Sequence, residues 1–285
     1  MTPPIRLIAI DIDGTLLDPQ FQISAANLHA LQRAHRDGAE IVLVTGRRHT
    51  FAMPVARMLG FDLWLISSNG AITKSTQGEA FHRDLLPAAT ARKLLARMDA
   101  FRGNAVLTFD RDEERGALVL ERTDELNASI GRWMEKNAAY IERVVLMENA
   151  LTTDPVQVMF CGTVGRMRLC QDQLERSGMG GEITVLKTEY PARDLCIVDV
   201  LNRDCSKGHA LERWARHRGI PRQQVMAIGD NYNDIEMLEF AGVPVIMGNA
   251  CEELKRAGYQ ITLPNDQSGV AAAIEQAMGM GVAGD

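Results

Sequence analysis

Short apolar runs alternate with amphipathic stretches along the first part of the chain. Residues 5–10 are rich in strand-favouring side chains and lack two-residue alternation, which is typical of a parallel strand buried on both faces. Residues 40–47 and 63–68 predict two further strands of this kind. Between the strands, residues 24–36 and 51–59 carry apolar positions at helical spacing. Strands separated by helices predict a parallel sheet.

The pattern changes between residues 84 and 200. Residues 87–101 predict an amphipathic helix, and the strand candidates 105–109 and 118–120 lie close enough in sequence to form a hairpin. Further short helices and strands follow in mixed order. We therefore predict an inserted α+β cap domain at residues 84–200.

After residue 201 the first pattern returns. Residues 207–218 predict a helix, and the apolar run 225–228 predicts a buried strand followed by polar residues. The fold class predicted for the chain is α/β, with a Rossmann-like parallel-sheet core and helices on both faces. This discontinuous core is predicted to consist of residues 1–83 and 201–285.

Composition excludes several classes of partner. A formal net charge of −6 in 285 residues argues against a nucleic-acid surface, and no apolar stretch is long enough to span a membrane. The five cysteines are odd in number and lack CxxC spacing, which favours a reducing compartment over a disulfide framework. The N-terminal residues do not resemble a secretory signal. We expect a cytoplasmic protein with neither a nucleic-acid nor a membrane partner.

Side chains that carry chemistry stand where the predicted strands end. Asp11 and Asp13 come directly after the first strand, Thr45 follows the second, and Asp230 follows the strand of the returning pattern. Because ligands gather at the carboxyl ends of parallel strands, we expect these side chains to share one edge of the sheet. Lys207, near a predicted helix start, adds a positive charge to the same set.

Phosphoryl transfer accounts for this combination. An aspartate such as Asp11 serves as a nucleophile toward phosphorus. A second carboxylate, Asp13, can protonate the leaving oxygen and then deprotonate the attacking water. Two carboxylates such as Asp11 and Asp230 repel a phosphate unless a hard cation neutralises them, and oxygen ligands suit Mg²⁺. Lys207 and Thr45 would stabilise the phosphoryl oxygens.

Each of these residues also has an ordinary structural interpretation. Thr45 could be an ordinary turn hydroxyl, and Lys207 a solvated helix residue. Asp230 or Asp234 could be a helix cap. Arg47 and Asn69 could satisfy backbone carbonyls in loops. The joint occurrence of all these residues at strand ends and helix starts favours the functional interpretation.

Four segments resemble, in order and spacing, the motifs of the haloacid dehalogenase (HAD) superfamily of aspartate-based phosphatases. These segments are residues 11–17 (DIDGTLL), 45–47 (TGR), 206–208 (SKG) and 229–237 (GDNYNDIEM). Residues 68–71 (SNGA), the large insertion, and residues 268–271 (SGVA) resemble the Cof-type branch of that superfamily. One departure lies at residues 202–205, where the branch commonly has a Pro and a Gly.

The resemblance implies a role for each candidate residue. It implies a nucleophile and metal ligand at Asp11, an acid/base at Asp13 that also binds metal through its backbone carbonyl, a metal ligand at Asp230, phosphate contacts at Thr45, Gly46, Lys207 and Asn233, and supporting roles for Asp234, Arg47 and Asn69. The implied cofactor is Mg²⁺, and the implied partner is a small phosphorylated metabolite.

The function expected from the sequence is Mg²⁺-dependent hydrolysis of small phosphorylated metabolites through an aspartyl-phosphate. Sugar phosphates are the first expectation for the substrate, followed by phosphorylated cofactors and nucleotides. A phosphomutase or phosphotransferase on the same core is the alternative among enzymes. A metabolite-binding regulatory module without turnover is the alternative outside enzymes, and the four complete motifs argue against it.

Overall fold

The chain forms two compact units in a computed structural model that describes residues 4–111 and 115–279. The core unit consists of Met1–Arg83 and Ser206–Asp285, and the inserted unit is Asp84–Cys205. The boundary predicted at residue 200 falls inside a strand that continues to Asn202. The inserted unit therefore extends to the end of that strand and the short turn after it.

The core unit contains an eight-stranded sheet in the order β14-β13-β12-β1-β2-β3-β4-β5. Its strands are β1 (Leu7–Ile10), β2 (Glu40–Val44), β3 (Trp64–Ser67), β4 (Ile72–Ser75), β5 (Ala80–Arg83), β12 (Val225–Gly229), β13 (Val243–Ile246) and β14 (Gln260–Ile261). All neighbours from β14 to β3 are parallel, as the apolar runs predict. Strands β4 and β5 add an antiparallel hairpin at one end of the sheet, which the sequence pattern does not predict.

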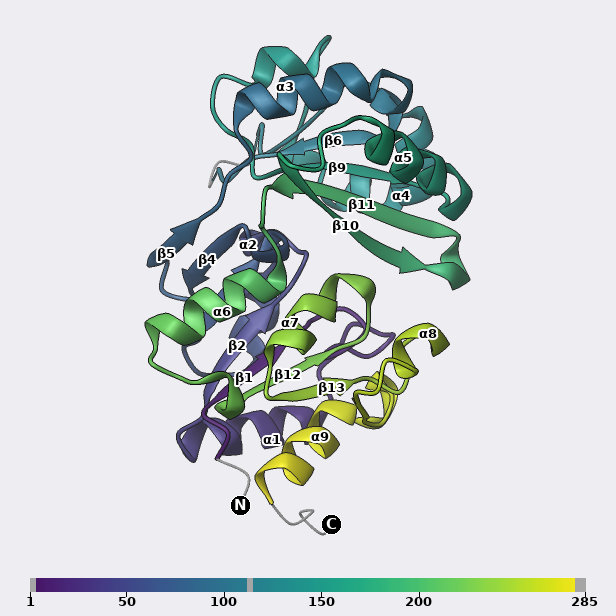
Figure 1. Ribbon diagram of the computed structural model, residues 1–285. Coiled ribbons are helices and arrows are strands. Elements are labelled where there is room, and N and C mark those ends of the chain that lie inside the picture. The colour runs from purple at the N-terminus through teal and green to yellow at the C-terminus, as the bar shows by residue number, and fades with distance from the viewer. Residues whose placement is uncertain (1–3, 112–114, 280–285) are drawn as a thin grey trace. The chain divides into compact units, whose positions relative to one another are not determined.

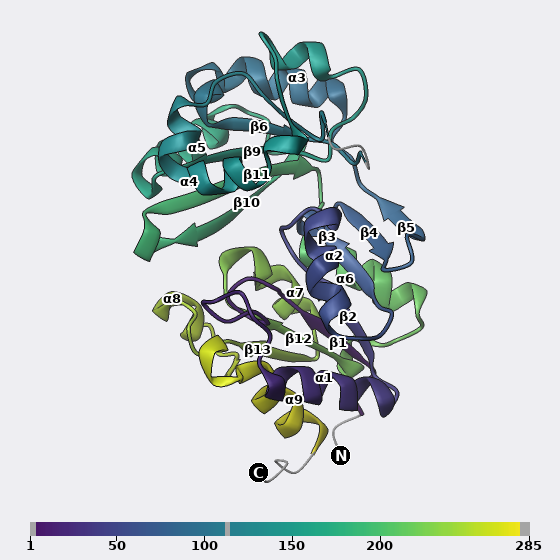
Figure 2. The same cartoon turned by 180° about the vertical axis from the view of Figure 1, so that it is seen from behind.

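Helices cover both faces of this sheet. They are α1 (Ala25–Arg36), α2 (His49–Met58), α6 (Lys207–His217), α7 (Ile235–Phe240), α8 (Glu252–Lys255) and α9 (Gly269–Met278). Helices α6 and α7 lie on the face turned to the viewer in Figure 1, and α1, α2 and α9 lie on the opposite face, seen in Figure 2. Short 3-10 turns precede several elements, among them η1 (Ser68–Gly70), η7 (Tyr232–Asp234) and η8 (Asn265–Gln267).

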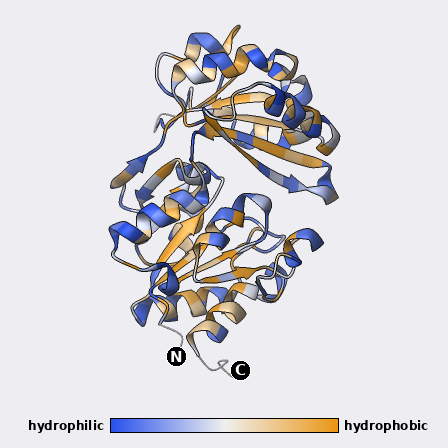
Figure 3. Cartoon of the chain, in the orientation of Figure 1, coloured by the Kyte–Doolittle hydropathy of each residue, from blue (hydrophilic) through white to orange (hydrophobic). Residues whose placement is uncertain are grey.

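The central strand β1 shows why the sheet is buried on both sides. Ile8 and Ile10 pack into the apolar cluster under α1, α2 and α9, whereas Leu7 and Ala9 pack into the cluster under α6 and α7. All four residues of the strand are fully buried. Figure 3 shows hydrophobic strands inside the core unit and hydrophilic positions along the helices that cover them.

The inserted unit has its own six-stranded sheet in the order β10-β11-β9-β6-β7-β8. Its elements are α3 (Ala88–Arg97), β6 (Ala105–Thr108), β7 (Leu118–Leu120), α4 (Asp124–Lys136), β8 (Ile141–Arg143), β9 (Gln157–Gly162), α5 (Val164–Arg176), β10 (Ile183–Tyr190) and β11 (Leu195–Asn202). The pairing is antiparallel except between β7 and β8. The inserted unit has two apolar clusters of its own, one on each face of its sheet. It therefore has a hydrophobic interior separate from that of the core unit.

No helix within the described residues has the length and apolar character needed to cross a membrane.

Candidate active site

The sheet register brings three predicted site residues to one edge of the core unit. Strand β1 pairs in parallel with β12 on one side and with β2 on the other, with Ile10 opposite both Ile228 and Leu43. Asp11, Thr45 and Asp230 follow the ends of these strands by one residue each. Their side chains therefore start from neighbouring points at the carboxyl edge of the sheet.

Lys207 joins two of the carboxylates. Its Nζ donates to Asp11 Oδ1 and to Asp234 Oδ1, both at 2.7 Å. The Lys207 side chain is only 1% exposed, and those of Asp11 and Asp234 are 7% and 0% exposed. A solvated helix lysine does not fit this burial, so the ordinary interpretation of Lys207 is wrong. Such a buried charge requires the paired carboxylates around it.

The start of α6 fixes the position of Lys207. Ser206 is the N-cap, and its hydroxyl accepts from the backbone N–H of His209 at 3.2 Å. Gly70 packs against this cap so closely that an added Cβ would lie 2.2 Å from Ser206 O. The turn η1 is thus pressed against the helix start that carries the lysine.

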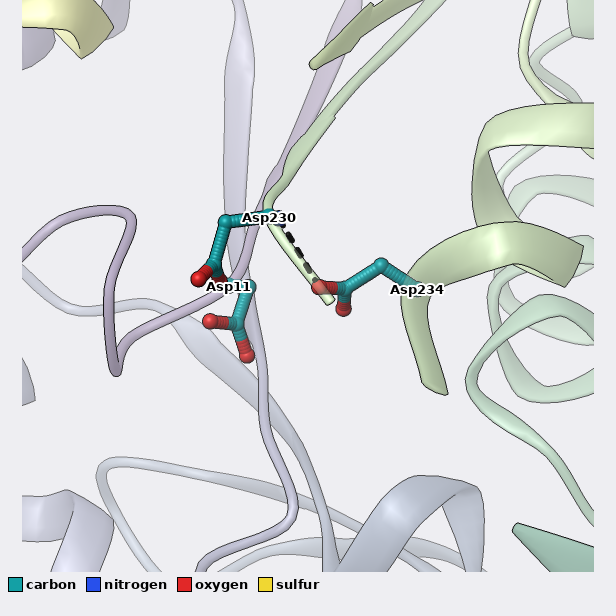
Figure 4. Close-up of side chains that lie close together, drawn as sticks. All are labelled: Asp11, Asp230 and Asp234. Atoms are coloured by element: carbon teal, nitrogen blue, oxygen red, sulfur yellow. Dashed lines mark hydrogen bonds between the residues drawn. The ribbon is translucent and has the colours of Figure 1, made fainter. Parts of the chain in front are cut away.

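Asp230 is held from two directions. Its Oδ1 accepts a hydrogen bond from the Thr15 hydroxyl at 3.2 Å, and its backbone N–H donates to Asp234 Oδ2 at 3.0 Å (Figure 4). Gly14 has φ +85°, and a Cβ there would lie 2.3 Å from Asp230 Oδ2. Gly14 therefore allows the left-handed turn and also leaves room for the Asp230 carboxylate.

Three carboxylates could hold a metal ion. One oxygen from each of Asp11, Asp230 and Asp234 lies within 4.8 Å of the others. Asp234 already accepts from Lys207 through Oδ1 and from the N–H groups of Asp230 and Asn231 through Oδ2. We infer that Asp11 and Asp230 have the better-placed ligand oxygens and that Asp234 orients them. An all-oxygen donor set fits Mg²⁺.

The electrostatics of the site also fit a cation. Burial raises the pKa of Asp11 to about 7, with Asp234 and Asp13 adding to the rise and Lys207 opposing it. Burial, followed by repulsion from Asp11 and Asp234, raises the pKa of Asp230 well above its ordinary value. Burial opposes the charge of Lys207, but the two carboxylates outweigh it and raise its pKa. One ammonium does not compensate the carboxylates, and a divalent cation would.

Asp13 is engaged by Arg47. Arg47 Nε donates to Asp13 Oδ2 at 2.7 Å, and Arg47 Nη2 donates to Asp13 Oδ1 at 2.6 Å. The backbone N–H of Arg47 in turn donates to Thr45 Oγ1 at 3.1 Å. Because this bond uses a lone pair of the Thr45 hydroxyl, its proton stays available for an acceptor in the site. Arg47 therefore contacts the Asp13 carboxylate, in addition to the backbone carbonyl of Phe51.

Asn69 connects two of the candidate segments. Its Oδ1 accepts from Asn233 Nδ2 at 2.9 Å, and its N–H donates to Thr45 O at 3.0 Å. A Cβ at Gly46 would lie 3.1 Å from Asn69 Oδ1. Asn69 adopts φ +53°, a left-handed conformation that Asn tolerates better than most residues. Asn69 thus contacts Asn233 through its side chain and Thr45 through its backbone, and its side chain lies close to Gly46.

Three contributors to the site are absent from the sequence prediction. Thr15 lies within the first motif, but its hydroxyl donates to Asp230, which is 215 residues away in the sequence. Asn249 Nδ2 donates to Gly14 O at 2.8 Å, and Asn265 Nδ2 donates to Leu17 O at 2.7 Å. Their positions after β13 and β14 put them on the same edge as the other site residues. That placement is the signal that would have identified them.

Comparison with known proteins gives consistent matches along the chain. Residues 8–274 match the haloacid dehalogenase-like hydrolase family. Phosphatase YwpJ of Bacillus subtilis (strain 168) is 32% identical over 287 residues, which cover 94% of this chain and 98% of YwpJ. Pyridoxal phosphate phosphatase YbhA of Escherichia coli (strain K12) is 28% identical over 279 residues, with coverages of 94% and 97%. The crystal structure of a haloacid dehalogenase-like hydrolase from Bacteroides thetaiotaomicron superposes with a TM-score of 0.77 at 30% identity, covering 95% of this chain and 99% of that one.

Proposed function

Because the chain belongs to the haloacid dehalogenase-like hydrolases and is a phosphatase, we propose that it hydrolyses small phosphorylated metabolites through an aspartyl-phosphate on Asp11, with Mg²⁺ as cofactor. The observation that carries the proposal is the buried Lys207 ammonium, shared between Asp11 and Asp234 at 2.7 Å each. The lysine holds one oxygen of Asp11 in place. The other oxygen of Asp11 is then the nucleophile.

In the first half-reaction, Asp11 Oδ2 forms a bond to phosphorus while the bond from phosphorus to the leaving oxygen breaks. Asp13 donates a proton to that oxygen, so the substrate leaves as an alcohol. Lys207 and the Thr45 hydroxyl donate to the phosphoryl oxygens, on which negative charge accumulates in the transition state. Asn69 and Asn233 keep the Thr45 loop in place through their hydrogen bonds.

In the second half-reaction, Asp13 removes a proton from water as the water oxygen attacks phosphorus. The bond between phosphorus and Asp11 breaks, inorganic phosphate leaves, and Asp13 carries the proton needed for the next cycle. Asp11, Asp230 and the Asp13 backbone carbonyl would hold Mg²⁺, which supplies charge neutralisation for the phosphoryl group. Thr15 and Asp234 keep the Asp230 carboxylate oriented for this purpose.

Sugar phosphates are the first candidates for the substrate. Pyridoxal phosphate is the second, because YbhA is named for that substrate and matches the chain over almost its full length. Other phosphorylated cofactors, such as flavin mononucleotide, are further candidates. Nucleotides are the last class of candidate substrate. We also propose a cytoplasmic location, which the odd number and the spacing of the five cysteines favour.

A panel of phosphomonoesters assayed for phosphate release with Mg²⁺ tests the proposal. We expect turnover of one class of metabolite, loss of turnover on chelation, and restoration by Mg²⁺. The Asp11→Asn variant is the matched control, since it keeps the shape of the site without the nucleophile. Product analysis separates the alternative, because a phosphomutase returns an isomer in place of phosphate. Undiminished turnover in metal-free protein would contradict the cofactor assignment.

A further inference from the structure

The contact between Arg47 and Asp13 has the geometry of a two-pronged clamp. Two nitrogens of one guanidinium reach the two oxygens of one carboxylate, at 2.7 and 2.6 Å. The side chains are 25% and 30% exposed, so the pair is partly shielded from water. Paired charge-assisted bonds of this type fix the plane of the carboxylate as well as its position.

Both ends of the clamp are anchored in the backbone. Arg47 donates its N–H to Thr45 Oγ1 at 3.1 Å and accepts at its carbonyl from the Ser68 N–H at 2.8 Å. Asp13 forms an isolated backbone bridge with Leu17. The arginine side chain thus links the loop after β1 to the loop after β2.

This geometry conflicts with one of the two roles proposed for Asp13. Both oxygens of Asp13 accept from Arg47, which is the arrangement of a proton-free carboxylate, whereas the first half-reaction needs a proton on one of them. The same arrangement suits the second half-reaction, in which Asp13 must be an oriented, proton-free carboxylate facing water.

We propose that Arg47 is a positioning residue, which holds Asp13 in its proton-accepting orientation for breakdown of the aspartyl-phosphate. One prong of the clamp is open while Asp13 carries the proton that it donates in the first half-reaction, and the clamp closes on the carboxylate that remains after donation. This inference rests on the proposed function, because it takes the two half-reactions and the roles of Asp11 and Asp13 from it.

Rapid-quench kinetics with p-nitrophenyl phosphate and Mg²⁺ test the proposal, because this leaving group needs no proton and the first half-reaction does not depend on Asp13. In Arg47→Met we expect nitrophenolate to appear in a burst of about one equivalent per site. Steady turnover should then be slower by roughly tenfold to a hundredfold, the usual loss when an orienting partner is removed. Intact-protein mass spectrometry should find the phosphoryl group on the enzyme.

Arg218→Met is the matched control. Arg218 Nε also pairs with a carboxylate, Glu40 Oε2 at 2.8 Å, but at the opposite end of β2 from the site. We expect no burst and no change in steady turnover. Arg47→Lys keeps the positive charge but cannot form two parallel hydrogen bonds to Asp13, so we expect a smaller burst than in Arg47→Met. If Arg47→Met does not fold, the burst in Arg47→Lys tests the proposal.

Chemical rescue distinguishes positioning from a structural role. Guanidinium ions added to Arg47→Ala should restore steady turnover and remove the burst, which a general loss of stability would not allow. A higher KM without a burst, or equal slowing of both half-reactions, would overturn the inference about Arg47 and leave the proposed function intact. Absence of enzyme-bound phosphate in every variant, Asp13→Asn included, would overturn both.

Discussion

Lys207 has a buried ammonium that forms ion pairs with the carboxylates of Asp11 and Asp234. We expect Lys207→Ala to lower turnover by on the order of a hundredfold or more, because the phosphoryl oxygens lose a preorganised positive charge. Steady-state kinetics on a phosphomonoester would measure the loss.

A second lysine supplies the control for that experiment. Lys255 pairs with Glu252 on α8 at 3.2 Å, and Lys255→Ala should leave turnover unchanged. Circular dichroism should show that both variants keep the fold. Wild-type kinetics in Lys207→Ala would remove the lysine from the proposed mechanism.

Asp11 and Asp13 should fail in different ways when their charge is removed. With an activated aryl phosphate, Asp13→Asn should form the aspartyl-phosphate and hydrolyse it roughly a hundredfold to ten-thousandfold more slowly, because water lacks its base. Asp11→Asn should never acquire a covalently bound phosphoryl group, since it lacks the nucleophile. Mass spectrometry after rapid acid quench measures the added mass. A labelled Asp11→Asn beside an unlabelled Asp13→Asn would reverse the assignment of roles.

Strand ends explain which residues of the site can be predicted from sequence. Asp11, Thr45 and Asp230 stand out because a polar residue directly follows a buried apolar run. Their partners are not visible in the same way. The bonds of Thr15 to Asp230 and of Asn233 to Asn69 join loops that only the folded sheet brings together. Loop conformation depends on these tertiary contacts, and local sequence preference does not specify it.

At the scale of elements, the contact between η1 and the start of α6 gives a paired test. Gly70 has φ +107° and a Cβ there would collide with Ser206 O, whereas Gly78 has φ +88° and a Cβ would meet no described atom within 4 Å. Gly78→Ala should therefore cost only about 1–2 kcal/mol of backbone strain. Gly70→Ala should cost about 1–3 kcal/mol more through the clash, and it should also lower turnover by displacing Lys207.

Thermal and denaturant unfolding of the two variants would measure that difference. Equal destabilisation would mean that η1 moves freely relative to α6. Activity provides the second readout, since Gly78 lies in the turn between β4 and β5, outside the site residues.

Length and burial decide which elements the sequence predicts. The helices α1 and α6 and the strands β1, β2 and β12 are long enough to show a clear apolar period. The hairpin of β4 and β5 is not predicted. Its residues include Lys74 and Ser75, which are buried although their side chains are polar, and the exposed ends of β5. A buried polar strand gives no hydrophobic pattern to detect.

At the scale of the whole molecule, two units joined by two chain crossings predict movement between them. We expect the inserted unit to act as a lid that closes over the substrate and excludes water. Energy transfer between dyes on Met58→Cys in α2 and Leu169→Cys in α5 would report the movement, since both positions are exposed, at 44% and 58%. A Cys251→Ser background leaves the remaining native thiols buried. Transfer that is unchanged by vanadate, a phosphate analogue, would contradict a lid.

The pairing of β1 with β12 sets the order in which a newly synthesised chain can become active. Thr15 and Asp230 are 215 residues apart, a length that a ribosome adds in roughly 10–40 s. Throughout that time the edge of β1 that pairs with β12 has no partner strand. The inserted unit is completed in the same period and can form its own apolar core. A nascent chain therefore carries its nucleophile early but gains a phosphatase site only near the end of translation.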